Sequence, residues 1–208
     1  MRVLIADKHA IVRAGLKKIL TDGIGGAKVD GVATGVDAVR GVRVKKYDVV
    51  MLEAALPDKS SLDVLRTLRR NDANMSVIVM GVHTDHQHAI RSYKCGANGY
   101  LSKEAGVEEI VAAVKKVSAG KLYVADFMAD KLVGGVCGHD NETLHAILSD
   151  REFDVMCMIA SGESLTCIGE KLSLSVKTIS TYRSRVLAKL KLKSNSELTR
   201  YAISLGLI

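Results

Sequence analysis

The stretch SLSVKTISTYRSRVLAKLKL, residues 173–192, decides how the C-terminal part of the chain folds. It reads as one helix that begins after Ser175, whose hydroxyl is suited to accept a hydrogen bond from a free backbone N–H of the first turn. Apolar residues recur at helical spacing. They predict a buried face made of Val176, Ile179, Val186, Leu187, Leu190 and Leu192.

The opposite face of this helix is basic and rich in short hydroxyl side chains. From Lys177 to Lys193 there are six basic residues and no acidic one. Such side chains let a helix enter the major groove of DNA and contact phosphates and base edges. A solvated surface helix is the alternative, because charge runs are often simply solvated. The face consists of Lys177, Thr178, Ser180, Thr181, Ser184, Arg185 and Lys189.

The flanking residues favour DNA binding. Residues 165–172 read as a short helix, and only residues 173–175 separate it from the basic helix, which is the spacing of a helix-turn-helix. Ser149 and Glu152 form a capping box that predicts the start of an earlier helix. The same pattern in Ser194 and Glu197 predicts a last helix over residues 196–205.

These residues together carry a family resemblance. LSDREFDVMCMIASGES, residues 148–164, and the residues from Ile168 to the end resemble the LuxR-type four-helix DNA-binding domain. The resemblance implies that the helix from Val176 to Leu190 is the recognition helix and that its basic face contacts double-stranded DNA. It also implies that the last helix pairs two copies, so a homodimer is expected.

Residues 1–121 read as strands alternating with helices. This alternation predicts an α/β class with a five-stranded, doubly wound parallel sheet, and the C-terminal residues add an all-α domain. We expect Ile11 to point inward from the first helix. The predicted strands are residues 2–6, 29–33, 48–52, 76–80 and 99–101, and the helices between and after them are residues 8–20, 36–46, 62–70, 85–95 and 107–119.

A connection separates the two predicted domains. Leu122 to Val133 has helical periodicity, and residues 134–142 are Gly-rich and polar, which is typical of a flexible joint. We therefore predict a receiver-like domain at 1–121, a linker at 122–147 and the helix-turn-helix domain at 148–208.

Chemistry-bearing residues follow the carboxyl ends of the predicted strands, where parallel sheets place their sites. The arrangement resembles the receiver domain of two-component response regulators, and the whole chain resembles a NarL/FixJ-type response regulator. The predicted pocket consists of Asp7, Lys8, Glu53, Gly81, Tyr100 and Lys103.

Three positions of this pocket depart from the receiver pattern. The resemblance implies a second acidic residue that helps hold Mg²⁺, a phosphoacceptor Asp, and a Thr or Ser that bonds the phosphoryl group. The chain has Lys8, Glu53 and Gly81 there, whereas Asp7, Tyr100 and Lys103 match. Mg²⁺ prefers several oxygen ligands, so the sequence predicts an atypical receiver without a metal.

The longer side chain of Glu53 can reach a lysine. We expect Lys8 or Lys103 to contact its carboxylate, so that an ionic cluster replaces the metal and the phosphoryl group. A decayed pocket with a solvated Glu53, or a glutamate placed there to mimic a phosphoryl group, are the alternatives. The histidines His83, His86 and His88 read as surface residues near the pocket, and a metal site made from them is the less favoured interpretation.

Composition agrees with a soluble nucleic-acid-binding protein. The 208 residues contain 30 Lys and Arg against 23 Asp and Glu, giving a net charge of +7 and a pI of about 9.2. This moderate excess suits a compact DNA footprint. The start of the chain lacks a signal-peptide pattern and no apolar run suits a membrane span, so a cytoplasmic location without membrane contact is expected. The cysteines Cys95, Cys137, Cys157 and Cys167 are expected to be reduced thiols.

The sequence thus predicts a sequence-specific DNA-binding transcription regulator that is not an enzyme and needs no cofactor. It is expected to act without the usual Asp phosphorylation, which makes a kinase partner doubtful. Two alternatives are a conventional phosphorylation-switched response regulator and a protein that sequesters another regulator.

Overall fold

The computed structural model describes residues 1–81, 86–125, 128, 147–172, 174–205 and 207–208. These residues form two compact units, Met1–Asp130 and Lys131–Ile208.

The N-terminal unit is built on one five-stranded sheet in which all strands are parallel. The strand order is β2-β1-β3-β4-β5. Continuous apolar runs form the central strands because both faces of this sheet are covered. The strands are β1 (Arg2–Ala6), β2 (Lys28–Val32), β3 (Val49–Glu53), β4 (Ser76–Gly81) and β5 (Gly99–Ser102). The predicted doubly wound α/β sheet is confirmed.

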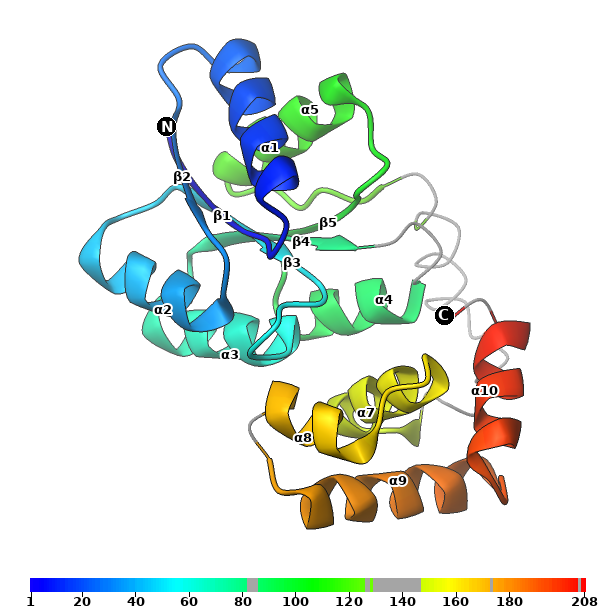
Figure 1. Ribbon diagram of the computed structural model, residues 1–208. Helices are drawn as coiled ribbons and strands as arrows, with labels where there is room; N and C mark the ends of the chain where they lie inside the picture. The colour runs from blue at the N-terminus through cyan, green and yellow to red at the C-terminus, as the bar shows by residue number, and fades with distance from the viewer. Residues whose placement is uncertain (82–85, 126–127, 129–146, 173, 206) are drawn as a thin grey trace. The chain divides into compact units, whose positions relative to one another are not determined.

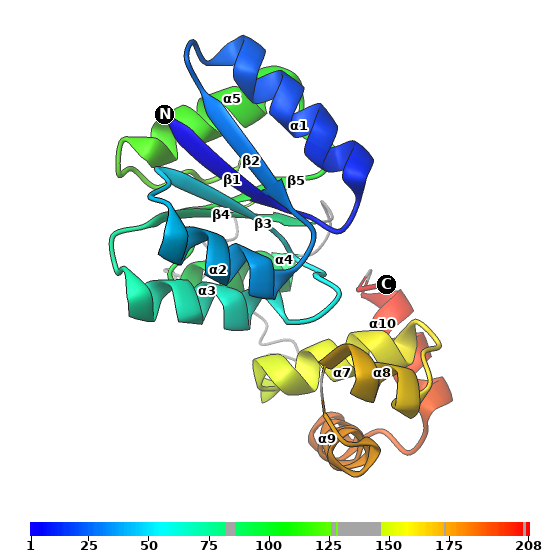
Figure 2. The same ribbon diagram turned by 60° about the vertical axis from the view of Figure 1, so that its left-hand side comes forward.

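Helices cover both faces of the sheet (Figures 1 and 2). Two helices, α1 (Ala10–Gly23) and α5 (Val107–Ser118), lie side by side on one face. The other face carries α2 (Gly35–Val44), α3 (Ser61–Asn71) and α4 (His86–Lys94). Polar side chains fix where these helices begin: the Ser60 hydroxyl accepts from Leu62 N, and Thr34 accepts from Asp37 N.

The core of the N-terminal unit confirms most of the predicted inward residues, with one correction. Leu16 and Leu20 of α1 are buried against the sheet, but the side chain of Ile11 is 84% exposed. Ile11 precedes Leu20 by nine residues, which at about 100° per residue puts it on the opposite side of the helix. The prediction that Ile11 points inward was wrong.

The segment after α5 is a second correction. Residues 121–125 are not helical, and Tyr123 forms a parallel bridge with Gly99 of β5. An unpaired edge strand offers free backbone groups, and these outweigh a helical pattern of apolar side chains. The predicted helix from Leu122 to Val133 is therefore wrong over its first residues, and most of its remainder lies outside the described residues.

The C-terminal unit contains four described helices, as predicted. They are α7 (Asp150–Ala160), α8 (Leu165–Leu172), α9 (Val176–Leu190) and α10 (Asn195–Ser204). A shared core joins them, with Phe153, Ile168, Ile179 and Leu198 all buried. Gly169 permits the tight turn between α8 and α9, since a Cβ there would lie 2.8 Å from the carbonyl oxygen of Leu174. Val176 is 46% exposed, so it does not belong to the buried face predicted for α9.

A buried glutamate ties α9 to the start of α7. The Ser149–Glu152 capping box is present, and Glu152 is 4% exposed. Lys189 of α9 donates to Glu152 Oε2 at 2.6 Å. Burial tends to raise the pKa of Glu152, but the hydrogen bonds from Lys189 and Ser149 outweigh it and lower that pKa below its ordinary value. The ion pair thus links the predicted recognition helix to the domain's first helix.

Two smaller expectations have an outcome in the described residues. Cys95, Cys157 and Cys167 are partly buried and form no disulfide within the described residues, and Cys137 lies outside them. None of the described helices is long and apolar enough to cross a membrane.

We predict that Lys189→Met lowers the unfolding free energy of the C-terminal unit by about 1 kcal/mol at pH 7, because it leaves a buried carboxylate without its ammonium partner. The lowered pKa of Glu152 means that this stabilisation is present above pH ~4.5 and is lost as the pH falls. Urea unfolding followed by circular dichroism at pH 7 and pH 4 should therefore show a smaller acid-induced loss in the variant. The matched control Lys177→Met, on an exposed residue of the same helix, should leave stability unchanged; equal effects of both substitutions would contradict this assignment.

Candidate functional site

The carboxyl ends of the strands bring the predicted pocket residues together. Asp7 follows β1, Glu53 ends β3, and Lys103 follows β5. Backbone hydrogen bonds continue the ladders past the strand ends, from Asp7 N to Val32 O and from Lys103 N to Gly81 O. These side chains therefore start from the same edge of the sheet.

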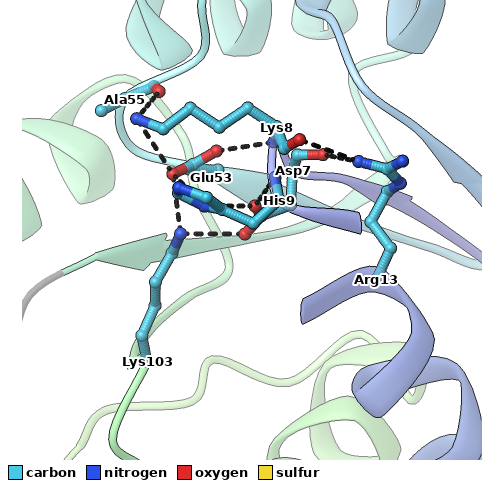
Figure 3. Close-up of polar contacts among 7 residues, drawn as sticks. All are labelled: Asp7, Lys8, His9, Arg13, Glu53, Ala55 and Lys103. Carbon is cyan, nitrogen blue, oxygen red and sulfur yellow. Dashed lines mark hydrogen bonds and ion pairs between the residues drawn. The ribbon is translucent and has the colours of Figure 1, made fainter. Parts of the chain in front are cut away.

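Glu53 is the most heavily bonded side chain of the pocket (Figure 3). Its carboxylate is buried; Oε1 accepts from Lys103 Nζ at 2.7 Å, and Oε2 accepts from the backbone N–H of Lys8 at 2.8 Å. The ammonium of Lys8 lies 3.5 Å from Oε1 and donates to Ala55 O at 3.1 Å. The expected contact between Glu53 and a lysine is present, and both lysines make it.

Asp7 is the second buried carboxylate, with an exposed fraction of 0%. Oδ1 accepts from the backbone N–H of His9 at 2.8 Å, and the ammonium of Lys103 lies 2.9 Å from Oδ2. The His9 ring also approaches this carboxylate, with Nδ1 3.1 Å from Asp7 Oδ1. Lys103 thus sits between the two acidic groups and pairs with both (Figure 3).

Two residues of this cluster escaped the sequence analysis. His9 lies within 3.6 Å of Glu53 as well as beside Asp7, and Arg13 donates to the backbone carbonyls of Asp7 and Lys8 at 2.6 and 3.1 Å. Arg13 lies six residues after Asp7, near the start of α1. Its partners are backbone carbonyls, so no side-chain pattern in the sequence pointed to this role.

The surroundings of Asp7 and Lys103 favour the charged form of both side chains. Burial tends to raise the pKa of Asp7, but the His9 N–H and the Lys103 ammonium outweigh it and bring that pKa below its ordinary value. Burial tends to lower the pKa of Lys103, but Glu53 and Asp7 outweigh it and raise that pKa. The lowered pKa of Asp7 stabilises the fold at pH values above the pKa of the carboxyl in the unfolded chain, near 4. The raised pKa of Lys103 stabilises the fold at pH values below about 10. Both contributions are present at neutral pH.

The donor set does not fit Mg²⁺. Asp7, His9 and Glu53 each offer one ligand atom, and these atoms lie within 4.8 Å of one another. Mg²⁺ demands an octahedron of oxygens, yet one oxygen of each carboxylate here already pairs with an ammonium group of Lys8 or Lys103, and the other accepts a backbone N–H. A dication would have to displace a lysine, so no step is assigned to a metal.

Gly81, the last residue of β4, lies next to the side chain of Tyr100, the second residue of β5. The Tyr100 side chain is fully buried, and a Cβ on Gly81 would overlap its hydroxyl oxygen and lie 2.8 Å from Cζ. The same Cβ would lie 3.3 Å from the Cβ of Ala54. Tyr100 therefore occupies space that any side chain at position 81 would need.

The histidine prediction needs a correction. His88 is not a surface residue: it is 5% exposed, and its Nε2 lies 3.0 Å from the hydroxyl of the buried Ser61. It follows Ser61 by 27 residues, and sequence spacing cannot reveal that α3 and α4 pack together. His83 and the side chain of His86 lie outside the described residues.

The predicted DNA-contacting face is exposed over much of α9. A hollow of about 300 Å³ runs along its N-terminal half, lined by Ser175, Lys177, Thr178, Thr181, Tyr182 and Arg185. Two hydroxyls expected to act as donors are already donating to the helix itself, Thr181 to Lys177 O and Ser184 to Ser180 O, each at 3.0 Å. They would have to rotate before donating to a ligand.

The basic residues of α9 divide into bonded and unbonded side chains. Lys189 pairs with Glu152, and Arg183 Nε donates to Asn195 Oδ1 at 2.6 Å. Within the described residues, the side chains of Lys177 and Arg185 form neither hydrogen bond nor ion pair. Lys177 and Arg185 are therefore the charges most available to a ligand.

Comparisons with known proteins follow this two-part organisation. Residues 3–115 match the response regulator receiver domain, and residues 146–202 match the bacterial regulatory proteins of the luxR family. The chain is 38% identical to the response regulator UvrY of Escherichia coli over 209 residues, covering 100% of this chain and 95% of UvrY. It is 34% identical to the response regulator GacA of Pseudomonas aeruginosa over 210 residues, covering 100% and 98%.

A solved structure shows the same fold over the full length. RcsB from Salmonella enterica serovar Typhimurium, described as bound to promoter rprA in the presence of the phosphomimetic BeF₃⁻, aligns with a TM-score of 0.70 at 22% identity, covering 100% of both chains. At that identity the likeness concerns the fold alone. The two domain matches and the full-length relatives show the family: the protein belongs to the LuxR-type response regulators.

Proposed function

We propose that this protein binds specific DNA sequences through α9 and regulates transcription, with Lys177 and Arg185 supplying its main charged contacts. The unbonded side chains of these two residues, beside the hollow of α9, carry this proposal. The description of RcsB as bound to promoter DNA supports it by analogy of fold. The site residues proposed for DNA are Lys177, Thr178, Ser180, Thr181, Ser184 and Arg185, and Lys189 is reassigned to the fold.

The protein acts, in this proposal, as a homodimer with domains at residues 1–121 and 148–208 joined by residues 122–147. Apolar side chains at the end of the chain support self-association, since Ile203 and Ile208 are 60% and 45% exposed. A single helix-turn-helix reads one half-site, and two copies double the number of phosphate contacts.

The receiver is proposed to be held by ionic contacts in place of an aspartyl-phosphate. This proposal rests on Glu53, whose carboxylate at the end of β3 is buried and bonded to Lys103 Nζ and Lys8 N. A phosphoryl group adds nearly two negative charges and strong acceptor oxygens. Glu53 already gives Lys103 an anionic partner, and Gly81 has no hydroxyl to offer a phosphoryl oxygen.

A second candidate is a conventional response regulator switched by phosphorylation from a partner kinase. The comparisons favour this candidate, because the full-length relatives are response regulators and RcsB is described with a phosphomimetic. The two candidates differ in what the pocket can bind, so a phosphodonor separates them. A third, sequestration of another regulator without DNA binding, is separated by a DNA-binding assay on the purified protein.

We predict that acetyl phosphate with Mg²⁺ adds no phosphate to the protein, because the chain has Glu53, Lys8 and Gly81 where the receiver pattern has a phosphoacceptor Asp, a second acidic residue and a Thr or Ser. Intact-mass spectrometry should show an unchanged mass, and DNA affinity measured with and without the donor should be equal. Lys8→Asp should raise Mg²⁺ affinity by adding an oxygen ligand, still without phosphorylation.

A positive control guards against an inactive preparation. The double variant Lys8→Asp with Glu53→Asp restores two carboxylates of the receiver pattern and should bind Mg²⁺ and gain phosphate mass. Addition of 80 Da to the unmodified chain in the same assay, at the level of the double variant, would establish the conventional candidate.

We predict that Lys177→Ala and Arg185→Ala weaken DNA binding and reduce the slope of log affinity against log salt concentration by about 0.9 each, because each contact with a phosphate releases a counterion. Fluorescence anisotropy at several salt concentrations measures both the DNA affinity and its salt slope, on a specific site and on random DNA.

The internal comparison for this experiment is Lys189→Ala. Its ammonium is compensated by Glu152, so the salt slope should change by much less than for Lys177→Ala. Equal slope changes would mean that Lys189 leaves Glu152 for a phosphate. An unchanged salt slope in all three variants would show that α9 does not contact DNA.

A further inference from the structure

The segment that leaves α5 is docked on the edge of the sheet. Within residues 121–125, Tyr123 N donates to Asn98 O at 2.8 Å, and its hydroxyl donates to Glu109 Oε1 at 2.7 Å. Gly99 makes room for it, because a Cβ there would lie 3.3 Å from Tyr123 Cβ. This segment begins the connection toward the C-terminal unit, so whatever holds Tyr123 fixes the origin of that connection.

A tyrosine hydroxyl from α4 completes the docking. Tyr93 Oη donates to the carbonyl oxygen of Tyr123 at 2.7 Å and accepts from the backbone N–H of Tyr100 at 3.1 Å. One hydroxyl thus bridges edge strand β5 and the docked segment, using both its donor and its acceptor capacity. Burial raises the pKa of Tyr93, while the N–H of Tyr100 opposes this, so the phenol stays protonated and remains a donor.

Tyr100, which donates to the Tyr93 hydroxyl, also contacts the receiver pocket. Tyr100 donates its backbone N–H to Tyr93, and its fully buried ring fills the space above Gly81. Gly81 in turn accepts the backbone N–H of Lys103, whose ammonium pairs with Glu53 and Asp7. Every step between the pocket and Tyr123 is therefore a direct contact.

We infer that Tyr93 is a positioning residue that couples the receiver pocket to the start of the interdomain connection, through Tyr100 on one side and Tyr123 on the other. A change that displaces the Tyr100 ring moves or loosens its N–H, which weakens the acceptor side of the Tyr93 hydroxyl and releases the Tyr123 carbonyl. The inference goes beyond the proposed function and does not depend on it, because it concerns contacts within the N-terminal unit alone.

The test uses the full-length chain labelled with ¹⁵N-tyrosine, which gives one amide signal for each of the six tyrosines. Tyr93→Phe removes only the hydroxyl and should accelerate hydrogen exchange of the Tyr123 amide about fivefold, the effect of losing one ordinary hydrogen bond. The matched control is Tyr47→Phe, which removes a hydroxyl that donates to Asp30 near the opposite edge strand. It should leave Tyr123 unchanged.

Coupling is measured by combining Tyr93→Phe with Gly81→Ala, which displaces the Tyr100 ring. In the parent chain Gly81→Ala should accelerate exchange of Tyr123, whereas in the Tyr93→Phe background it should have no additional effect on Tyr123. If Gly81→Ala does not fold, Tyr100→Leu perturbs the same ring without a clash and replaces it in the cycle.

Two results would overturn the inference. Unchanged Tyr123 exchange in Tyr93→Phe would show that the hydroxyl does not hold the segment. Accelerations that simply multiply in the double variant would show that the pocket and the segment respond independently. Either result stands whether or not the protein binds DNA.

Discussion

The short contact between Lys103 Nζ and Glu53 Oε1 organises the receiver pocket. It places an ammonium between two buried carboxylates, and Lys8 adds a second ammonium from the solvent side. The two negative and two positive charges therefore compensate one another, whereas burying any one of them alone would be costly. Replacing one of these four residues leaves a charge uncompensated, so the residue at each position restricts which residues the other three positions tolerate.

The same cluster fixes the loops around it. The Lys8 ammonium also bonds Ala55 O after β3, while further along that loop Asp58 accepts from the N–H groups of Gly35 and Val36 at the start of α2. Arg13 bonds the carbonyls of Asp7 and Lys8 from α1. The pocket is thus tied to helices on both faces of the sheet, and Gly81 with Tyr100 extends this packing to β5.

The sequence predicted what is local or periodic. Apolar runs located all five strands to within about a residue, and because parallel strands end at one edge, the meeting of Asp7, Lys8, Glu53 and Lys103 followed from the order of elements. The predictions that failed depend on tertiary contacts.

The burial of His88 could be predicted only by knowing that α3 and α4 pack together. The extended segment at Tyr123 could be predicted only by knowing that β5 is an edge strand. The role of Arg13 was hidden because its partners are backbone carbonyls, which every residue has. Lys189 looked like its neighbours on α9 until the position of Glu152 was known.

The pairing of Glu53 with Lys103 can be measured by a double-mutant cycle on the full-length protein. Unfolding free energies of the parent, Glu53→Gln, Lys103→Met and the double variant give the coupling between the two side chains. We expect a favourable coupling of about 1–3 kcal/mol at neutral pH, as for other groups in one ion-pair network. A coupling within error of zero would show that the two side chains do not stabilise each other.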